Sequence, residues 1–314
     1  MEKINIGISA CLLGQTVRFD GGHQHDHYLT DVLGKYFEYH PLCPEVAIGL
    51  GVPRSSLRLI ANAEGEPQAI MPNTGVNHTE ALRQFADRAV PKLPEISGYI
   101  LKKKSPSCGM ERVRIYSDKG MPIANGMGIF AQRLIENCPL LPVEEEGRLF
   151  DLRLRENFIK RVYVYAEWQR LVRDGLTYHH LLQFHSRHKL LLIAHHYGNS
   201  KLLGKLIANF SPDNLSTVAQ EYIALFMQTL KRLPDRRHHG QVLTRIVATI
   251  NKHLKPEQQK DVSKLIEEYL AGYVSLATPV RMIRHYLTQV GEPYLELQSY
   301  LKPYPEELGL MNGV

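Results

Sequence analysis

The chain has 314 residues, of which 44% are hydrophobic and 22% are charged, the composition of a globular protein large enough for two domains. These proportions exclude a disordered or fibrous chain, and no apolar run approaches the ~18 residues that a membrane-spanning helix requires. The net charge of +6 is unevenly placed: residues 1–155 hold 18 Lys and Arg against 18 Asp and Glu, whereas residues 156–314 hold 20 against 14. A basic second half predicts a polyanionic partner, although a helical domain without such a partner would carry the same charge.

The first half of the sequence alternates segments typical of strands with segments typical of helices. Residues 57–61 and 68–71 flank a turn and predict a hairpin. Strands alternating with crossover helices predict a Rossmann-like α/β domain with a largely parallel sheet, which we place at residues 1–148, with residues 140–147 as the linker. The other elements expected here are strands at 4–10, 39–42, 98–102 and 113–117 and helices at 26–39, 79–93 and 128–137.

From residue 151 onward the apolar spacing is helical, and Gly, Pro or Asn separates the segments. This pattern predicts an all-α domain at residues 149–314. Its expected helices span 151–173, 177–196, 199–209, 213–231, 235–253, 257–272, 279–290 and 293–301.

Three cysteines, Cys11, Cys43 and Cys108, follow expected strands. Each lies in a turn rich in Gly, Pro or Ser, whose backbone N–H groups suit an anion such as a metal cluster held by thiolates. They are 32 and 65 positions apart, unlike the local spacing of a zinc ribbon or a bacterial ferredoxin, so three unrelated structural cysteines remain the alternative. Because ligands bind beyond the carboxyl ends of parallel strands, one shared metal site is the sharper hypothesis. Cys138 ends a helix without such neighbours and is not expected as a ligand.

The first residues enter a strand directly, without the charged and apolar regions of a signal peptide. Four cysteines in a chain of this kind are more typical of metal binding or catalysis than of disulfides. We therefore expect a cytoplasmic protein with no membrane partner.

Three ordered motifs resemble those of the 2-thiouracil desulfurase family. They are Ile8-Ser-Ala-Cys-Leu-Leu-Gly14 with Val17-Arg-Phe-Asp-Gly21, Cys43-Pro-Glu45 with Gly49-Leu-Gly-Val-Pro-Arg54, and Lys102-Lys-Lys-Ser-Pro-Ser-Cys-Gly109. From about residue 149 the chain is similar to a helical domain fused to these desulfurases in bacterial proteins, most clearly at Phe184-His-Ser-Arg-His-Lys-Leu-Leu-Leu-Ile-Ala-His195. The fused group is understood to remove sulfur from 4-thiouridine in transfer RNA, with the helical domain helping to hold the RNA.

The resemblance implies a 4Fe–4S cluster on Cys11, Cys43 and Cys108, with one iron open to the sulfur of the substrate. An open metal position acts as a Lewis acid, whereas a fully ligated cluster mainly transfers electrons. The implied activity is therefore a non-redox desulfidase that converts a thiocarbonyl to a carbonyl and releases sulfide.

The same resemblance assigns roles to residues around the cysteines. Glu45 matches the family's catalytic carboxylate and Ser105 its important serine; judged by themselves they are a helix-start carboxylate and a turn serine. We also expect Arg18, Asp20 and Ser107 to contact the substrate. Phe19 and Tyr28 lie near the cysteine motifs and are candidates to stack on a pyrimidine. Lys103 and Lys104 are candidates to contact phosphate.

Basic residues of the second half are the candidates for phosphate contacts with transfer RNA. We expect RNA binding by Arg187, Lys189, Lys201, Lys205, Arg236 and Arg237, with Lys231, Arg232 and Arg245 as further candidates. His185 and His188 lie one helical turn apart, but no H-E-x-x-H pattern accompanies them, so core or surface histidines are favoured over a zinc site.

Two alternatives stay open at this point. A dinucleotide cofactor is not expected, because Gly126-Met-Gly128 lacks a third glycine and an acidic partner; these glycines instead suit a turn closing the cysteine site. The enzyme alternative acts on free thiouracil or thionucleosides. The non-enzyme alternative is a metal-binding, nucleic-acid-binding redox sensor.

Overall fold

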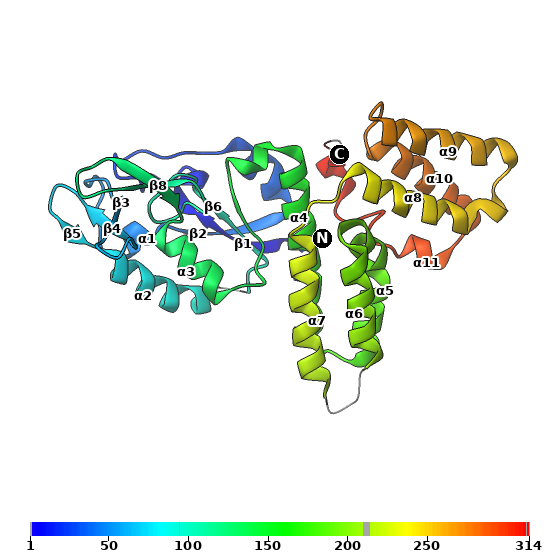
Figure 1. The fold of residues 1–314 in the computed structure, drawn as a ribbon, viewed down its shortest axis with the longest axis horizontal. Helices are drawn as coiled ribbons and strands as arrows, with labels where there is room; N and C mark the ends of the chain where they lie inside the picture. The colour runs from blue at the N-terminus through cyan, green and yellow to red at the C-terminus, as the bar shows by residue number, and fades with distance from the viewer. Residues whose placement is uncertain (1, 94, 210–213, 312, 314) are drawn as a thin grey trace. The chain divides into compact units, whose positions relative to one another are not determined.

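The computed structural model describes residues 2–93, 95–209, 214–311 and 313 and divides the chain into two compact units, Met1–Phe150 and Asp151–Val314 (Figure 1). The first unit is α/β and the second is helical, which confirms the predicted fold class.

A four-stranded parallel sheet organises the first unit. Its strand order is β2-β1-β6-β9, so the carboxyl ends of β2, β1 and β6 are neighbours. Gly7 lets the Tyr99 ring cross from the adjacent strand, since a Cβ at Gly7 would lie 2.3 Å from Tyr99 Cδ2. The strands are β1 (Ile4–Ser9), β2 (Phe37–Leu42), β6 (Gly98–Leu101) and β9 (Val143–Glu145).

The first unit also contains a second, mixed sheet, whereas the sequence predicted a single sheet. Its order is β5-β4-β3-β7-β8, with only β3 and β7 parallel. The predicted hairpin is confirmed as β3 and β4, whereas β5 and β8 were not predicted. The strands are β3 (Arg58–Ala61), β4 (Pro67–Met71), β5 (Val76–Asn77), β7 (Val113–Tyr116) and β8 (Pro122–Gly126).

The helices of the first unit pack on both sheets. They are α1 (Pro44–Ala47), α2 (Thr79–Ala89) and α3 (Ile129–Asn137), and α2 lies beside α3 (Figure 1). Leu82 of α2 and Ile129 of α3 are buried with the apolar side chains of the second sheet. Phe130 of α3 contacts Tyr99 of the first sheet, their ring centroids 6.0 Å apart. Helix α3 therefore joins the two sheets.

Two sequence-based expectations for the first unit are wrong. Residues 26–39 do not form one helix: a π-helical turn (Tyr28–Val32) and a 3-10 turn (Leu33–Lys35) lead into β2, which begins at Phe37 because it pairs with β1 from Ile4. The supposed linker at 140–147 contains β9, which pairs with β6 and is buried. In both cases pairing with a distant strand overrides the local pattern.

The second unit follows the predicted helices closely. Asp151 caps its first helix by accepting from Arg153 N at 2.9 Å and Leu154 N at 3.0 Å. The predicted start at residue 213 lies outside the described residues, and only the first turn of the helix expected at 293–301 forms. The helices are α4 (Leu152–Arg173), α5 (Tyr178–His195), α6 (Tyr197–Ala208), α7 (Leu215–Leu230), α8 (Arg236–Ile250), α9 (Pro256–Ala271), α10 (Ala277–Val290) and α11 (Pro293–Glu296).

Aromatic side chains fill the core of the second unit. Trp168 of α4, Phe184 of α5 and Phe226 of α7 are buried, with ring centroids 5.3 Å apart for Trp168 and Phe184 and 5.2 Å for Phe184 and Phe226. Within the described residues no helix is both long enough and apolar enough to cross a membrane.

Candidate active site

Three cysteines meet at the carboxyl ends of three adjacent strands. Cys11 lies in a 3-10 turn directly after β1, Cys43 is the N-cap residue of α1 directly after β2, and Cys108 lies in the loop after β6. All three line one pocket of about 460 Å³. Cys138 does not line it and ends α3. The structure therefore brings together the three predicted cysteines and leaves the fourth apart.

Burial makes these thiols poor nucleophiles. It raises the pKa of the Cys11 thiol to about 11, and Lys102 opposes that rise. Burial also raises the pKa of Cys43 and of Cys108, with Cys43 adding to the rise at Cys108. Reactive cysteines need a lowered pKa, whereas a bound metal deprotonates a thiol outright. This environment suits metal ligands better than nucleophiles.

Ser105 organises the turn that carries Cys108. Its Oγ accepts from Ser107 N at 3.3 Å and from Cys108 N at 3.1 Å, and its carbonyl accepts from Gly109 N at 2.8 Å. The chain enters this turn through Lys104, whose φ of 59° is left-handed. The amides that we expected to face an anion are thus already bound by Ser105.

The N-terminus of α3 holds the same turn from behind. Gly128 N donates to Gly109 O at 2.7 Å, Ile129 N to Pro106 O at 3.1 Å and Ala131 N to the Ser107 carbonyl at 3.0 Å. A Cβ at Gly128 would lie 2.5 Å from the carbonyl carbon and oxygen of Ser107. These contacts leave no room for a side chain, so Gly128 serves close packing rather than phosphate binding.

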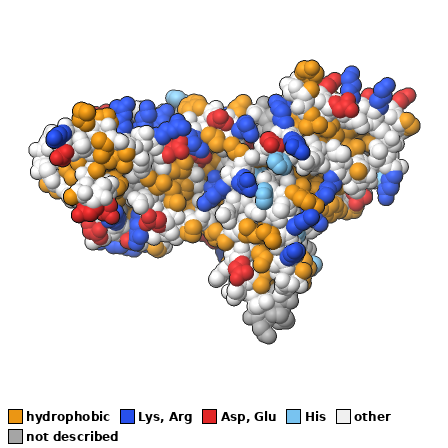
Figure 2. Space-filling model, in the orientation of Figure 1, with side chains coloured by type: hydrophobic (Ala, Val, Ile, Leu, Met, Phe, Trp, Pro, Cys, Tyr) orange, Lys and Arg blue, Asp and Glu red, His pale blue; other side chains and the backbone are white. Residues whose placement is uncertain are grey.

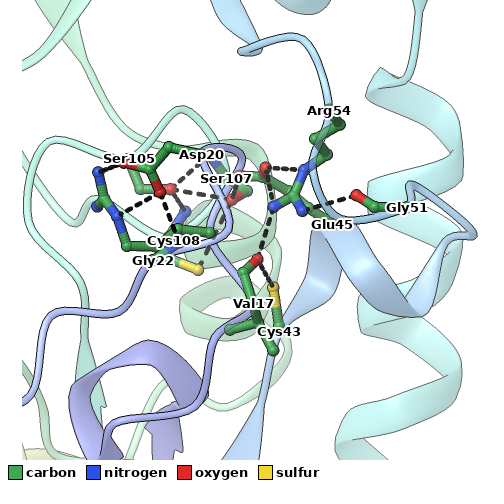
Figure 3. A network of polar contacts seen from close by, with 11 residues as sticks. Val17, Asp20, Gly22, Cys43, Glu45, Gly51, Arg54, Ser105, Ser107 and Cys108 are labelled. Carbon is green, nitrogen blue, oxygen red and sulfur yellow. Dashed lines mark hydrogen bonds and ion pairs between the residues drawn. The ribbon is translucent and has the colours of Figure 1, made fainter.

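A buried ion pair fixes Glu45 at the start of α1 (Figure 3). Glu45 Oε2 accepts from Arg54 Nη2 at 2.8 Å and Nε at 3.1 Å, and the two side chains are 12% and 6% exposed. Arg54 also donates to Val17 O at 3.0 Å and Gly51 O at 3.1 Å. The sequence had shown Arg54 only as the end of a motif; its spacing of nine residues from Glu45 fits neither helix nor strand.

Ser107, rather than Ser105, contacts this carboxylate. Ser107 Oγ donates to Glu45 Oε1 at 2.6 Å and lies 3.0 Å from Ser105 Oγ (Figure 3). Because the Ser107 proton goes to Glu45, the proton between the two hydroxyls comes from Ser105. The three groups form one hydrogen-bonded row in which Ser105 is the outer member.

The end of strand β9 and the residue after it supply carboxylates that sequence reasoning missed. Glu145 Oε1 accepts from Met110 N at 2.7 Å and Glu111 N at 3.3 Å, while Glu146 Oε2 accepts from Lys103 N at 2.7 Å. Glu146 also pairs with the ammonium of Lys102. Both carboxylates are buried, and together they grip the Cys108 loop at its two ends. A run of three glutamates resembled a solvated linker, which concealed this role.

Of the predicted substrate contacts, Arg18 and Phe19 line the pocket, as do Lys103 and Lys104. The Arg18 guanidinium lies 5.5 Å from the Phe19 ring centroid. Asp20 does not line the pocket: its Oδ1 accepts from Gly22 N at 3.0 Å, and this bond, helped by Arg18, lowers the pKa of the Asp20 carboxyl.

Comparison with known proteins identifies the first unit. Residues 6–146, which include the three cysteines and Glu45, match a family model described as 2-thiouracil desulfurase. The chain belongs to the 2-thiouracil desulfurase family. Residues 189–305 match a second model, described as a protein of unknown function (DUF1722).

Two relatives each match about half of this desulfurase-family chain. Uncharacterized protein YbgA of Escherichia coli (strain K12) is 27% identical over 162 residues, which are 51% of this chain and 96% of that protein. A solved structure named [4Fe-4S]-dependent thiouracil desulfidase TudS is 33% identical, and the match covers 50% of this chain and 98% of that one, with a TM-score of 0.39.

The desulfurase pocket has the donors that a 4Fe–4S cluster requires. Such clusters are held by cysteine thiolates, and three thiols line this pocket, with Cys11 and Cys108 buried and Cys43 half-buried. In the described residues no group of three or more His, Cys, Asp and Glu side chains could hold a single metal ion. The three thiols line one pocket but do not converge on the position of one ion. We judge the donor set to fit the cluster.

In the second unit the predicted basic residues are dispersed, and Lys and Arg side chains are spread over the face seen in Figure 2. Arg187 pairs with Glu167 at 3.2 Å. Arg236 is half-buried and donates to Tyr269 O at 2.9 Å and to the Val274 carbonyl at 3.2 Å, so its guanidinium serves the fold. The remaining predicted phosphate contacts are exposed: Lys189, Lys201, Lys205 and Arg237.

Tyr197 is an aromatic residue that sequence reasoning did not single out. It is 45% exposed, and Lys201 Nζ and the Arg245 guanidinium lie 4.6 and 5.9 Å from its ring centroid. Hydrogen bonding with Lys201, and then with Arg245, lowers the pKa of the Tyr197 hydroxyl. The i, i+4 spacing of Tyr197 and Lys201 was the available signal.

Three histidines of α5 have contacts within the fold through their Nδ1 atoms. His188 Nδ1 lies 2.6 Å from Ser299 Oγ, and His185 Nδ1 lies 3.2 Å from Tyr222 Oη. His195 Nδ1 lies 2.6 Å from Arg232 O. These contacts agree with the expectation of core histidines.

Proposed function

We propose that this protein is a 4Fe–4S-dependent, non-redox desulfidase that removes sulfur from 4-thiouridine in transfer RNA. The reaction converts the thiocarbonyl to a carbonyl, with water supplying the oxygen and sulfide carrying away the sulfur. Such a substrate places the reaction in the cytoplasm. The observation that carries the proposal is that three thiols line one pocket together with the hydrogen-bonded Glu45–Ser107 pair.

Cys11, Cys43 and Cys108 would hold the cluster. Bound there, it supplies one iron with an open coordination position, a Lewis acid for the sulfur of a thiocarbonyl. Lys102 pairs with Glu146. Among the cations around Cys11 it has the largest effect on the pKa of the thiol, which it lowers, so it favours the thiolate.

Other side chains of the same pocket suit the proton transfers. Glu45 acts as the base that takes a proton from the attacking water, and the Arg54 pair keeps its carboxylate fixed. The hydrogen bond from Ser107 holds Oε1 in place at the pocket. Ser105 positions Ser107 and Cys108 through their N–H groups. Phe19, 41% exposed at the pocket, offers its face to the pyrimidine ring.

The second unit would supply affinity for RNA. An exposed aromatic ring between two cations, as at Tyr197 with Lys201 and Arg245, suits an unpaired base and its phosphates. Lys189, Lys205 and Arg237 would add contacts to the RNA backbone, which make affinity fall with salt.

The test is sulfide release by the full chain, purified without oxygen and showing cluster absorbance near ~400 nm. Thiolated transfer RNA, the same RNA without sulfur and free 2-thiouracil are assayed side by side, with no reductant or oxidant added. We expect release from the thiolated RNA alone or in large excess over 2-thiouracil.

Glu45→Ala tests the base, and Glu64→Ala, an exposed carboxylate in the β3–β4 turn, is its matched control. The Glu45 variant should keep the cluster absorbance and lose activity by about 100-fold or more. Full activity of that variant would refute the assignment, and preference for free 2-thiouracil would indicate a base-salvage desulfidase instead.

A further inference from the structure

Beside the cysteine pocket lies a second hollow that the proposed reaction does not use. This hollow, about 650 Å³ in volume, is lined by His23, His25 and His27 together with Phe150. Lys103 and Gln24 line both cavities. The thiolated base and whatever occupies the second hollow would therefore be separated by a shared wall.

The second hollow offers donors and positive charge despite its two carboxylates. Asp26 Oδ1 is occupied by the amides of Tyr28 at 3.0 Å and Leu29 at 3.2 Å. Glu146 is occupied by the Lys102 ammonium and by Lys103 N at 2.7 Å. Within the described residues the ammonium of Lys103 has no ion pair, so it is available to an anion.

His23 adds a directed donor. Its Nδ1 accepts from His25 N at 3.2 Å, so in the neutral ring the proton sits on Nε2. The imidazoles of His23 and His25 are exposed. That of His27 is exposed too, and its Nδ1 lies 3.2 Å from Asp31 Oδ2. An exposed ammonium and an N–H donor on one wall suit a phosphate group.

Phe150 supplies an apolar platform in the same hollow. Its side chain is 68% exposed, although burial would stabilise a phenylalanine. Aromatic faces beside a basic groove bind the bases of single-stranded nucleic acid by stacking. Phe19 is the corresponding aromatic side chain in the lining of the cysteine pocket.

We propose that the second hollow binds the nucleotide adjoining the thiolated one, with its base on Phe150 and the connecting phosphate between Lys103 and His23. This rests on the proposed desulfidase function and deepens it: the substrate is a polynucleotide whose thiolated residue and one neighbour enter as an unstacked strand. A nucleoside fills only the cysteine pocket.

The placement of Lys103 can be tested without changing its charge. A Cβ at Gly147 would lie 2.5 Å from Lys103 Cδ and 3.0 Å from its Nζ, so Gly147→Ala displaces this side chain. Lys103→Gln removes the ammonium itself. Lys119→Gln, an exposed lysine of the β7–β8 turn, is the matched control.

The experiment compares two substrates of the cluster-loaded full chain: 4-thiouridine and a trinucleotide with 4-thiouridine in the middle. The measured quantity is the ratio of kcat/KM for the trinucleotide to that for the nucleoside. Stacking on an aromatic side chain predicts a ratio of about ten or more, and Phe150→Ala should lower it about tenfold. Phe150→Trp should restore the ratio, while Met121→Ala, also an exposed apolar residue, should leave it unchanged.

The outcomes separate the inference from the function on which it rests. A ratio near one in the parent protein, or an unchanged ratio in Phe150→Ala, overturns the second subsite while sulfide release from both substrates still supports a desulfidase. Lower ratios in both Gly147→Ala and Lys103→Gln, with Lys119→Gln unchanged, support the phosphate position. Absence of sulfide from the nucleoside, the trinucleotide and thiolated transfer RNA alike refutes both.

Discussion

Replacing Arg54 by methionine should destabilise the first unit by several kcal/mol. Arg54 and Glu45 are nearly buried and lie 2.8 Å apart, nitrogen to oxygen. At a charge separation of about 4 Å and an effective dielectric constant of about 20, their attraction is about 4 kcal/mol. Removing one partner of a buried pair typically costs about 3–5 kcal/mol, because the other charge stays buried. Arg54→Met also leaves the Val17 and Gly51 carbonyls without this donor.

The assay is urea unfolding with two optical signals. Trp168 is the chain's one tryptophan and lies in the second unit, so its fluorescence reports that unit, whereas far-ultraviolet circular dichroism reports both. We expect Arg54→Met to lower the first unit's free energy of unfolding by about 3–5 kcal/mol and to leave the Trp168 transition in place. Arg54→Lys should recover part of the loss, since an ammonium cannot make the paired contacts of a guanidinium.

A double-mutant cycle decides whether the pair is the cause. Glu45→Leu and Arg54→Met should each destabilise, and the double variant should be more stable than the sum of the two losses predicts by about 2 kcal/mol or more. Losses that add to within about 0.5 kcal/mol would show that the two side chains act independently, and the account of a coupled buried pair would be refuted.

Three further predictions concern stability. Gly128→Ala places a methyl group against the backbone of Ser107 and should cost about 2–3 kcal/mol in urea unfolding of the first unit; an unchanged midpoint would contradict the close packing. Ser105→Ala removes the acceptor of two turn N–H groups and should cost about 1–2 kcal/mol by the same measurement, with faster amide exchange at Ser107. The second unit should weaken below pH 6.5. Burial lowers the pKa of His195 to about 3 and that of His239 well below its usual value, so the unfolded chain takes up protons that the folded unit does not. Between pH 7 and pH 5 each of these two histidines should lower the free energy of unfolding by about 2 kcal/mol, seen as a Trp168 transition at lower urea concentration. Equal stability at both pH values would show that these rings are protonated in the fold.

Sequence alone predicted the features that depend on local residue patterns. The helices of the second unit follow the 3.6-residue apolar period, and capping residues such as Asp151 and Asp235 mark their starts. Cys11 and Cys43 come just after β1 and β2, and a strand ending before each was predicted, so their shared edge could be predicted from parallel topology.

What sequence did not predict depends on contacts between distant segments. Glu145 and Glu146 are buried only because the amides of the Cys108 loop and Lys102 satisfy them, and nothing in the local sequence signals those partners. The contact between Ser107 and Glu45 was not predicted for the same reason, since the two residues lie 62 positions apart in the sequence.

The strand order of the first sheet also sets when the site can form. Cys11, Cys43 and Cys108 come from β1, β2 and β6, and their thiols meet only after these three strands have paired in parallel. Parallel pairing closes long loops before its contacts form, which makes it a late and slow event in folding. If these thiols hold a metal centre as proposed, it would be added to a chain that has already folded, whereas in zinc fingers the metal drives folding. Chelation would then empty the pocket and leave the sheet standing.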